Sequence, residues 1–141
     1  MGWVERVRTL LDAPSPATLT TYGEGGSALV HPVWFRFEDG AFEVVIAEGD
    51  AKLRNLERDP RCSLLVFETV PPFRGVEASA PPELVRGDAT EARASISGRY
   101  LGSPSLGRRY AEERKKPGVL FRLLDERPRV WDLSAILPTD A

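Results

Sequence analysis

The feature that most constrains the fold is a pair of strand-like segments joined by Asp39-Gly40. In the first segment, residues 27–37, apolar residues recur at every second position and therefore share one face. The residues on this face are Leu29, His31, Val33, Phe35 and Phe37. The second segment, AFEVVIA, follows the turn at once. Because Asp-Gly supplies the positive φ angles of a tight turn, the pattern predicts an antiparallel β-hairpin.

Pro32 lies inside the first strand of this hairpin. Proline has no N–H to donate to a neighbouring strand, so its presence predicts a sheet edge, a bulge or a break. By the alternation, Val30, Pro32, Trp34 and Arg36 point away from the core face. A large aromatic side chain is costly to leave in water. Either a partner subunit or a ligand covers Trp34, or it belongs to a second core layer.

Further strands and helices can be read along the chain. Strands are predicted at residues 17–22 and 62–68 and from residue 74 onward, although Pro81-Pro82 leaves the continuation of that last strand open. Residues 119–125 and 128–134 predict a final hairpin or near-hairpin. Helices are predicted at residues 1–15, 50–59, 89–100 and 106–115, and residues 136–141 as a loose tail. This order is typical of an antiparallel barrel decorated by helices.

Composition excludes several classes of function. A chain of 141 residues with a net charge of −2 suits one domain and offers no general attraction to nucleic acid. The apolar runs are far shorter than the roughly 20 residues of a membrane span, and the N-terminus lacks a signal-peptide core. One cysteine (Cys62) and one histidine exclude a disulfide framework and a multi-histidine metal site within one chain. We expect a cytoplasmic protein without a metal or a membrane partner.

The short helix over residues 50–59 is the first candidate binding element. Asp50 is a good N-cap, and Leu53 and Leu56 form its buried stripe. Lys52 and Asn55 lie three residues apart and share a face beside that stripe. A lysine in the first turn opposes the helix dipole, whereas a phosphate bound at the helix N-terminus would reverse this effect. The alternative is an ordinary solvated face, on which Glu57 and Asp59 balance the basic residues Arg54, Arg58 and Arg61.

The chain carries no serine-hydrolase, Walker or dinucleotide-binding motif. Without a serine–histidine set or a metal cluster, it has little acid–base equipment of its own. If it is an enzyme, a cofactor supplies the difficult chemistry. No catalytic side chain can be assigned.

The order ATLTTYGEGG, HPVWFRFEDG and VVIAEGDAKLRNLERDPRCSLLV resembles the pyridoxamine 5′-phosphate oxidase-like, FMN-binding split-barrel family. It is most similar to the flavin/deazaflavin branch, which includes coenzyme F-420-dependent reductases. The resemblance is strong over residues 17–68 and fainter to about residue 133. It implies a mainly β split barrel of six to seven mostly antiparallel strands with three to four helices, in one domain over residues 1–141. It also implies an obligate homodimer with a deazaflavin or FMN at the subunit interface.

The family's motifs suggest site residues in this chain. The strand that backs the cofactor ring corresponds to Pro32, Val33, Trp34 and Phe35, and the phosphate-holding group to Ala47, Ala51, Lys52 and Asn55, with Arg54 or Arg58 nearby. The implied function is hydride transfer between the cofactor and a small organic substrate. The alternatives are a non-catalytic binder of flavin, deazaflavin or haem and, less favoured, pyridoxamine 5′-phosphate oxidation. Two departures stand out: Ile46-Ala47 lacks a common hydroxyl, and Ala80-Pro81-Pro82 replaces a Gly-x-Ala segment.

Overall fold

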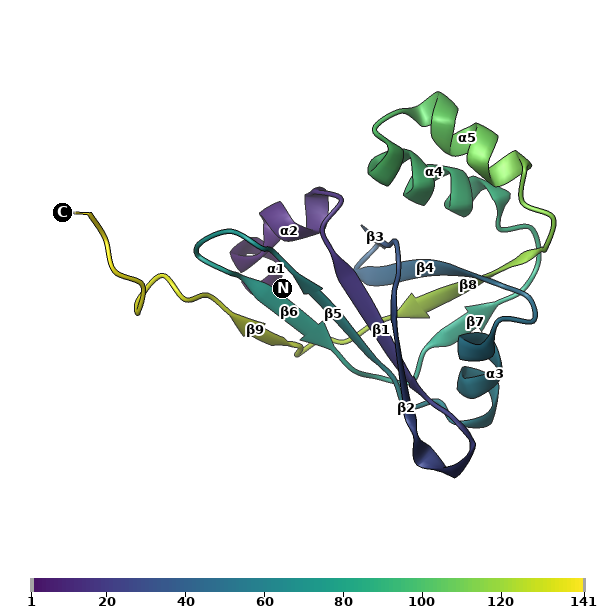
Figure 1. The fold of residues 1–141 in the computed structure, drawn as a ribbon, viewed down its shortest axis with the longest axis horizontal. Coiled ribbons are helices and arrows are strands. Elements are labelled where there is room, and N and C mark those ends of the chain that lie inside the picture. The colour runs from purple at the N-terminus through teal and green to yellow at the C-terminus, as the bar shows by residue number, and fades with distance from the viewer. Residues whose placement is uncertain (1, 141) are drawn as a thin grey trace.

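The computed structural model describes residues 2–140, which form two antiparallel sheets with helices at their ends (Figure 1). The strands are β1 (Ala17–Tyr22), β2 (Ala28–Pro32), β3 (Arg36–Glu38), β4 (Ala41–Ala47), β5 (Ser63–Phe67), β6 (Gly75–Ala78), β7 (Glu83–Val85), β8 (Gly118–Leu123) and β9 (Arg129–Trp131). The helices are α1 (Gly2–Arg6), α2 (Arg8–Asp12), α3 (Ala51–Arg58), α4 (Thr90–Leu101) and α5 (Pro104–Glu112), with a 3-10 turn, η1, at Glu24–Gly26.

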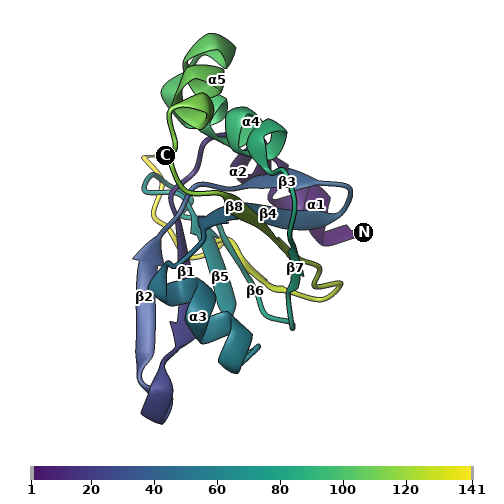
Figure 2. The same ribbon diagram turned by 90° about the vertical axis from the view of Figure 1, so that its right-hand side faces the viewer.

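The five-stranded sheet has the order β2-β1-β5-β6-β9, and the four-stranded sheet the order β3-β4-β8-β7. No strand of residues 2–140 is shared by the two sheets, so the mainly β fold is a split barrel, as expected. The core fills the space between the sheets, with Leu19, Phe42, Leu64 and Phe121 almost completely buried. Helices α4 and α5 pack against each other at the top of Figure 2, near β3 and β4, and α3 lies below them, beside β1.

The predicted hairpin and its interrupted strand are both confirmed. Asp39 (φ 50°) and Gly40 (φ 79°) form the turn between β3 and β4. β2 ends at Pro32, and β3 begins at Arg36. β2 pairs with β1 whereas β3 pairs with β4, so residues 33–35 carry the chain from one sheet to the other. Pro32 therefore ends the strand of the five-stranded sheet just before the chain enters the four-stranded sheet.

Pro81-Pro82 has the same effect later in the chain. β6 before it pairs with β5 and β9, whereas β7 after it pairs with β8 in the other sheet. The predicted hairpin of residues 119–125 and 128–134 is wrong, because β8 pairs with β4 and β7 while β9 pairs with β6. The connection that contains Pro128 crosses between the sheets instead of turning back on its own strand.

These crossings explain why residues 2–140 contain nine strands rather than six or seven. Seven strand-like runs were predicted, and two of them are each divided by proline into two strands of different sheets. The N-terminal helix predicted over residues 1–15 is likewise two short helices that end at Asp12, because Val7 leaves helical geometry (φ −125°, ψ 21°). Its predicted apolar stripe of Val4, Val7, Leu10 and Leu11 is nonetheless buried.

The C-terminal segment leaves the body of the molecule after β9 (Figure 1). The segment begins with a turn, in which the N–H groups of Ile136 and Leu137 donate to the carbonyl of Leu133. Ile136 is 75% exposed. No helix in residues 2–140 is long and apolar enough to cross a membrane. The same residues contain no group of three or more histidine, cysteine, aspartate or glutamate side chains placed to hold a metal ion.

Candidate functional site

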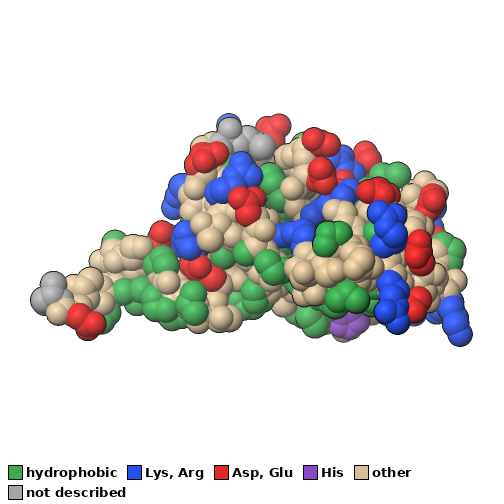
Figure 3. Space-filling view, turned by 90° about the horizontal axis from the view of Figure 1, so that it is seen from above, with side chains coloured by type: hydrophobic (Ala, Val, Ile, Leu, Met, Phe, Trp, Pro, Cys, Tyr) green, Lys and Arg blue, Asp and Glu red, His purple; other side chains and the backbone are tan. Residues whose placement is uncertain are grey.

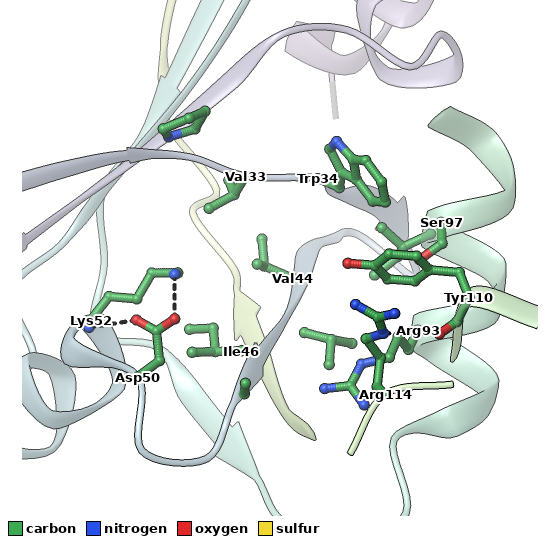
Figure 4. Close-up of a pocket in the computed structure, with 14 residues that line it drawn as sticks. Val33, Trp34, Val44, Ile46, Asp50, Lys52, Arg93, Ser97, Tyr110 and Arg114 are labelled. Atoms are coloured by element: carbon green, nitrogen blue, oxygen red, sulfur yellow. Dashed lines mark hydrogen bonds and ion pairs between the residues drawn. The ribbon is translucent and has the colours of Figure 1, made fainter. Parts of the chain in front are cut away.

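A cleft of about 500 Å³ lies between β4, the β2–β3 connection, the start of α3 and the α4–α5 pair (Figure 4). Its lining combines apolar side chains with cationic ones. The lining residues are Pro32, Val33, Trp34, Val44, Val45, Ile46, Ala47, Asp50, Lys52, Arg93, Ile96, Ser97, Tyr110 and Arg114. The volume falls in the range of small-molecule and cofactor sites, about 300–1,000 Å³.

The middle of the cleft is apolar. Val44 and Ile46 of β4 line it, together with Val33 from the β2–β3 connection. All three side chains belong to the buried core, with exposed fractions of 2% for Val44, 1% for Ile46 and 9% for Val33. Ser97, on the buried side of α4, adds a hydroxyl group to the lining. Such a surface accepts a flat ring through apolar contact and leaves hydrogen bonding to the ends of the cleft.

Trp34 forms one wall and is held by the chain's own helices. Its ring stacks on Tyr100 of α4, with 5.3 Å between ring centroids and 7° between the planes. Tyr110 of α5 packs against it at 5.4 Å and 48°. The outward direction predicted for Trp34 is correct, and it remains 37% exposed. Tyr100 and Tyr110 thus cover two sides of the Trp34 ring, as side chains of a second packing layer would.

Arg99 and Tyr100 tie α4 to this wall. The Arg99 guanidinium donates to the carbonyl of Phe35 and, at 2.9 and 2.5 Å, to those of Leu11 and Ala13. The Tyr100 hydroxyl donates to the Ser15 carbonyl at 2.9 Å and accepts from the Phe35 N–H at 3.4 Å. Burial lowers the pKa of Arg99 and raises that of Tyr100. These bonds fix the β2–β3 connection against the helices.

Lys52 and Asp50 occupy one end of the cleft. Asp50 caps α3 by accepting from the Lys52 backbone N–H at 3.0 Å, and the Lys52 Nζ atom lies 2.9 Å from Asp50 Oδ2. Partial burial on its own would raise the pKa of Asp50, but the hydrogen bonds and charge of Lys52 outweigh it and lower that pKa. The predicted N-cap is confirmed, and it brings a carboxylate to the lysine expected to meet phosphate.

Arg93 and Arg114 occupy the other end (Figure 4). Arg93 of α4 donates to the Lys116 carbonyl at 3.2 Å. The Arg114 guanidinium carbon lies 4.2 Å from the centroid of the Tyr110 ring. Burial, with a smaller effect of the like charge on Arg114, lowers the pKa of Arg93. The ion pairs within residues 2–140 include Lys52 but neither of these arginines.

The structure brings together only some of the predicted site residues. Pro32, Val33, Trp34, Ala47 and Lys52 line the cleft, whereas Phe35, Ala51, Arg54, Asn55 and Arg58 do not. Phe35 is completely buried in the core.

Asn55 does not lie beside Lys52 in the cleft, because its side chain is hydrogen-bonded to other residues. Its Nδ2 donates to Thr21 Oγ1 at 3.1 Å, and its Oδ1 accepts from Arg58 at 2.9 Å. It thus ties α3 to β1, while Arg54 bonds the Gly49 carbonyl. Of the two departures, Ala47 lies in the lining without a hydroxyl, and Pro81-Pro82 lies outside it.

Arg93, Tyr110 and Arg114 are cleft residues that the sequence pattern did not identify. They come from two helices and the segment after them, more than 40 residues beyond Lys52 in the chain. The one available signal was the basic run Arg114-Lys115-Lys116, directly before a strand whose pairing with β4 could not be read from the sequence.

Residues 4–130 match the profile of the pyridoxamine 5′-phosphate oxidase family. No curated protein matches the chain.

Several solved structures share the fold. A conserved hypothetical protein, Rv2991 from Mycobacterium tuberculosis, has a TM-score of 0.76 and 25% identity over 97% of this chain and 89% of its own. An F420 reductase has a TM-score of 0.69 and 19% identity, covering 86% of this chain and 94% of its own. The haem storage protein HutZ from Vibrio cholerae has a TM-score of 0.67 and 17% identity, covering 92% and 94%.

Proposed function

This chain belongs to the pyridoxamine 5′-phosphate oxidase family, and on that basis we propose that it is an oxidoreductase. It binds a deazaflavin, coenzyme F-420, or FMN in the cleft and transfers hydride between that cofactor and a small organic substrate. The observation that carries the proposal is the apolar middle of the cleft, with a cation at each end. An F420 reductase among the proteins of the same fold is consistent with it.

The residues present fit such a cofactor. A planar ring can lie against Val44 and Ile46, with Val33 and Trp34 beside it. The phosphate can reach the start of α3, where the positive end of the helix dipole and Lys52 favour an anion. It must share Lys52 with Asp50, so the phosphate contact is a competition between two anions.

The bound ring supplies the hydride chemistry, and the chain supplies position and environment. The β4 side chains and Trp34 exclude water from one side of the cleft. The hydroxyl groups of Ser97 and Tyr110 can donate hydrogen bonds to the cofactor or substrate. The lining contains no histidine, cysteine or methionine, which favours a flavin-type ligand over haem held by those ligands.

We propose further that the chain works as a homodimer through the edge formed by β2. This strand is the outermost of the five-stranded sheet, and Val30 is 56% exposed on it. Figure 3 shows apolar side chains gathered along the edge that carries the single histidine, which belongs to β2. An uncovered apolar edge strand favours pairing with another chain. Light scattering should give twice the monomer mass, and Val30→Lys should weaken the dimer.

The test of function is a side-by-side titration of the purified protein with FMN, deazaflavin and haemin. Flavin absorbance, quenching of deazaflavin fluorescence and the haem Soret band report binding of each compound. Micromolar binding of a flavin-type compound and reduction of the bound compound by a hydride donor would support an oxidoreductase. Binding without turnover across a substrate panel would favour a carrier. Preferential haem binding would overturn the proposal.

A further inference from the structure

A second hollow adjoins the cleft where β4 ends. It is lined by Ala47, Arg93, Glu113, Arg114, Lys115 and Lys116, and it shares Ala47, Arg93 and Arg114 with the cleft. Figure 4 shows Arg93 and Arg114 across the apolar middle from Lys52 and Asp50. The two ends of the site therefore carry separate positive groups.

Arg93 lies in a space that the sequence leaves open for it. A Cβ atom added to Gly118, the first residue of β8, would lie 2.9 Å from Arg93 Nη2 and 3.2 Å from its Cζ. The same Cβ atom would lie 2.4 Å from Cγ1 of Val45, so the glycine leaves room for both Val45 and the Arg93 guanidinium. The bond from Arg93 Nη1 to the Lys116 carbonyl fixes the same group from the other side. The guanidinium is held in place while one edge still faces the cleft.

Arg114 and Lys116 complete the cluster. Arg114 lies over the Tyr110 ring, and its Nε donates to the Tyr110 carbonyl at 3.2 Å. Lys116 Nζ lies 3.8 Å from the position that a Cβ atom would take on Gly49, in the turn between β4 and α3. The three cations come from two parts of the chain, α4 and the segment after α5, and line the hollow at the end of β4.

The cluster lacks carboxylate partners, whereas eight of the sixteen arginines of this chain form ion pairs within residues 2–140. Arg36, Arg74, Arg86 and Arg122 are all paired with glutamates. Among residues 2–140, Arg93, Arg114 and Lys116 form no such pair, and Glu113 at the rim pairs with Arg109 instead. Like charges that lie close together repel each other. An anion bound between them would relieve this repulsion.

We propose that Arg93, Arg114 and Lys116 form an anion subsite that holds the carboxylate or phosphate group of the substrate. The identification of the ligand as the substrate rests on the proposed function, in which Lys52 and the start of α3 hold the cofactor phosphate. The forked guanidinium groups match the two oxygens of a carboxylate or phosphate. An anionic group anchored there places the rest of a small molecule over the apolar middle of the cleft.

The probe is benzoate, with benzyl alcohol as the neutral compound of similar size. The readout is the ¹H–¹⁵N NMR signal of the arginine Nε–H groups, which reports binding without any cofactor. Benzoate should shift the Arg93 and Arg114 signals in a saturable way, and benzyl alcohol should leave them unchanged. Equal shifts with both compounds, or no shift with benzoate, would overturn the proposal.

Variants separate this subsite from the general charge of the surface. Arg93→Gln and Arg114→Gln should each weaken benzoate binding by about tenfold or more, as expected for loss of a charge-assisted contact. Arg108→Gln removes an exposed arginine of α5 outside the cleft and should change nothing. A loss as large in Arg108→Gln would mean that only net charge matters. Arg93→Lys keeps the charge but loses the fork, so it should bind more weakly than the unaltered protein even if Arg93→Gln fails to fold.

The cofactor titration distinguishes the two proposals. Lys116→Gln changes a cluster residue that lies outside the cleft lining, so it should weaken benzoate binding and retain the cofactor affinity of the unaltered protein. A tenfold loss of cofactor affinity in this variant would assign the cluster to the cofactor and overturn its role with substrate. Benzoate binding without binding of any flavin-type compound would instead refute the proposed function while leaving the anion subsite in place.

Discussion

The Nζ atom of Lys52 lies 2.9 Å from Oδ2 of Asp50, the residue that caps the helix carrying Lys52. The lysine is therefore held in position at its end of the cleft without a bound ligand. The same contact partly neutralises it. Binding of a phosphate at this point depends on how the pair shares its charge with the incoming anion.

Replacement of Lys52 by alanine should weaken binding of a phosphorylated cofactor by about 1–3 kcal/mol, the usual effect of losing a charge-assisted hydrogen bond. Fluorescence or calorimetric titration measures the change. Arg54→Ala is a suitable control, because Arg54 is exposed on the same helix and bonds the Gly49 carbonyl outside the cleft. Unchanged affinity in Lys52→Ala would place the phosphate elsewhere.

Replacement of Asp50 by asparagine should have the opposite effect on the cofactor. Asparagine still caps a helix, but it removes the negative charge that competes for Lys52. We expect tighter binding of a phosphorylated ligand and little change in stability. Asp50→Ala removes the cap as well and should lower the free energy of unfolding by about 1 kcal/mol. Weaker binding in Asp50→Asn would mean that the carboxylate mainly positions Lys52.

The local features of this fold were accessible from the sequence. Asp39-Gly40, the Asp50 cap and the break at Pro32 each depend on the backbone preferences of one or two residues. These preferences survive in the folded chain. What the sequence did not reveal is which sheet each segment joins. β9 extends the edge at β6 rather than returning along β8, and that choice depends on edges formed by distant segments.

The residues of the candidate site also fall into two groups, those with a local sequence signal and those placed only by the packing of distant segments. Lys52 and Trp34 were found because each is anomalous locally, a cation in the first turn of a helix and an outward aromatic residue in a strand. Arg93 is an ordinary helical residue in the sequence, and only the packing of α4 beside Gly118 gives it a position in the site. Asn55 was assigned to the site by its spacing from Lys52, but Thr21 of β1 is its hydrogen-bond partner.

Replacement of Arg99 by alanine should loosen α4 and α5 from the rest of the molecule. Three carbonyl groups, those of Leu11, Ala13 and Phe35, would lose a charged donor in a half-buried setting. We expect a loss of about 2–3 kcal/mol in the free energy of unfolding. Amide exchange in residues 33–35 should become faster. Arg99→Lys should recover only part of the loss, because one ammonium group cannot reproduce the planar fork. Equal stability of all three proteins in urea would contradict this role.

The thiol of Cys62 should be unreactive at pH 8 in the folded protein. Its side chain is buried and donates to the Ala80 carbonyl at 3.4 Å, and burial raises its pKa to about 11. Iodoacetamide should therefore modify the native protein slowly at pH 8 and the urea-unfolded chain rapidly, since the unfolded thiol ionises near pH 8.5. Mass spectrometry of the modified chain measures both rates.

The same pKa predicts how Cys62 affects stability as the pH changes. Its folded pKa lies above its unfolded pKa, so its contribution is complete below about pH 8.5 and is lost as the pH rises toward 11. Relative to Cys62→Ala, which lacks the titrating group, the native chain should lose about 2 kcal/mol between pH 7 and pH 10. Urea unfolding of both proteins across this range gives the difference directly. A difference that stays constant with pH would show that the folded thiol ionises as readily as the unfolded one.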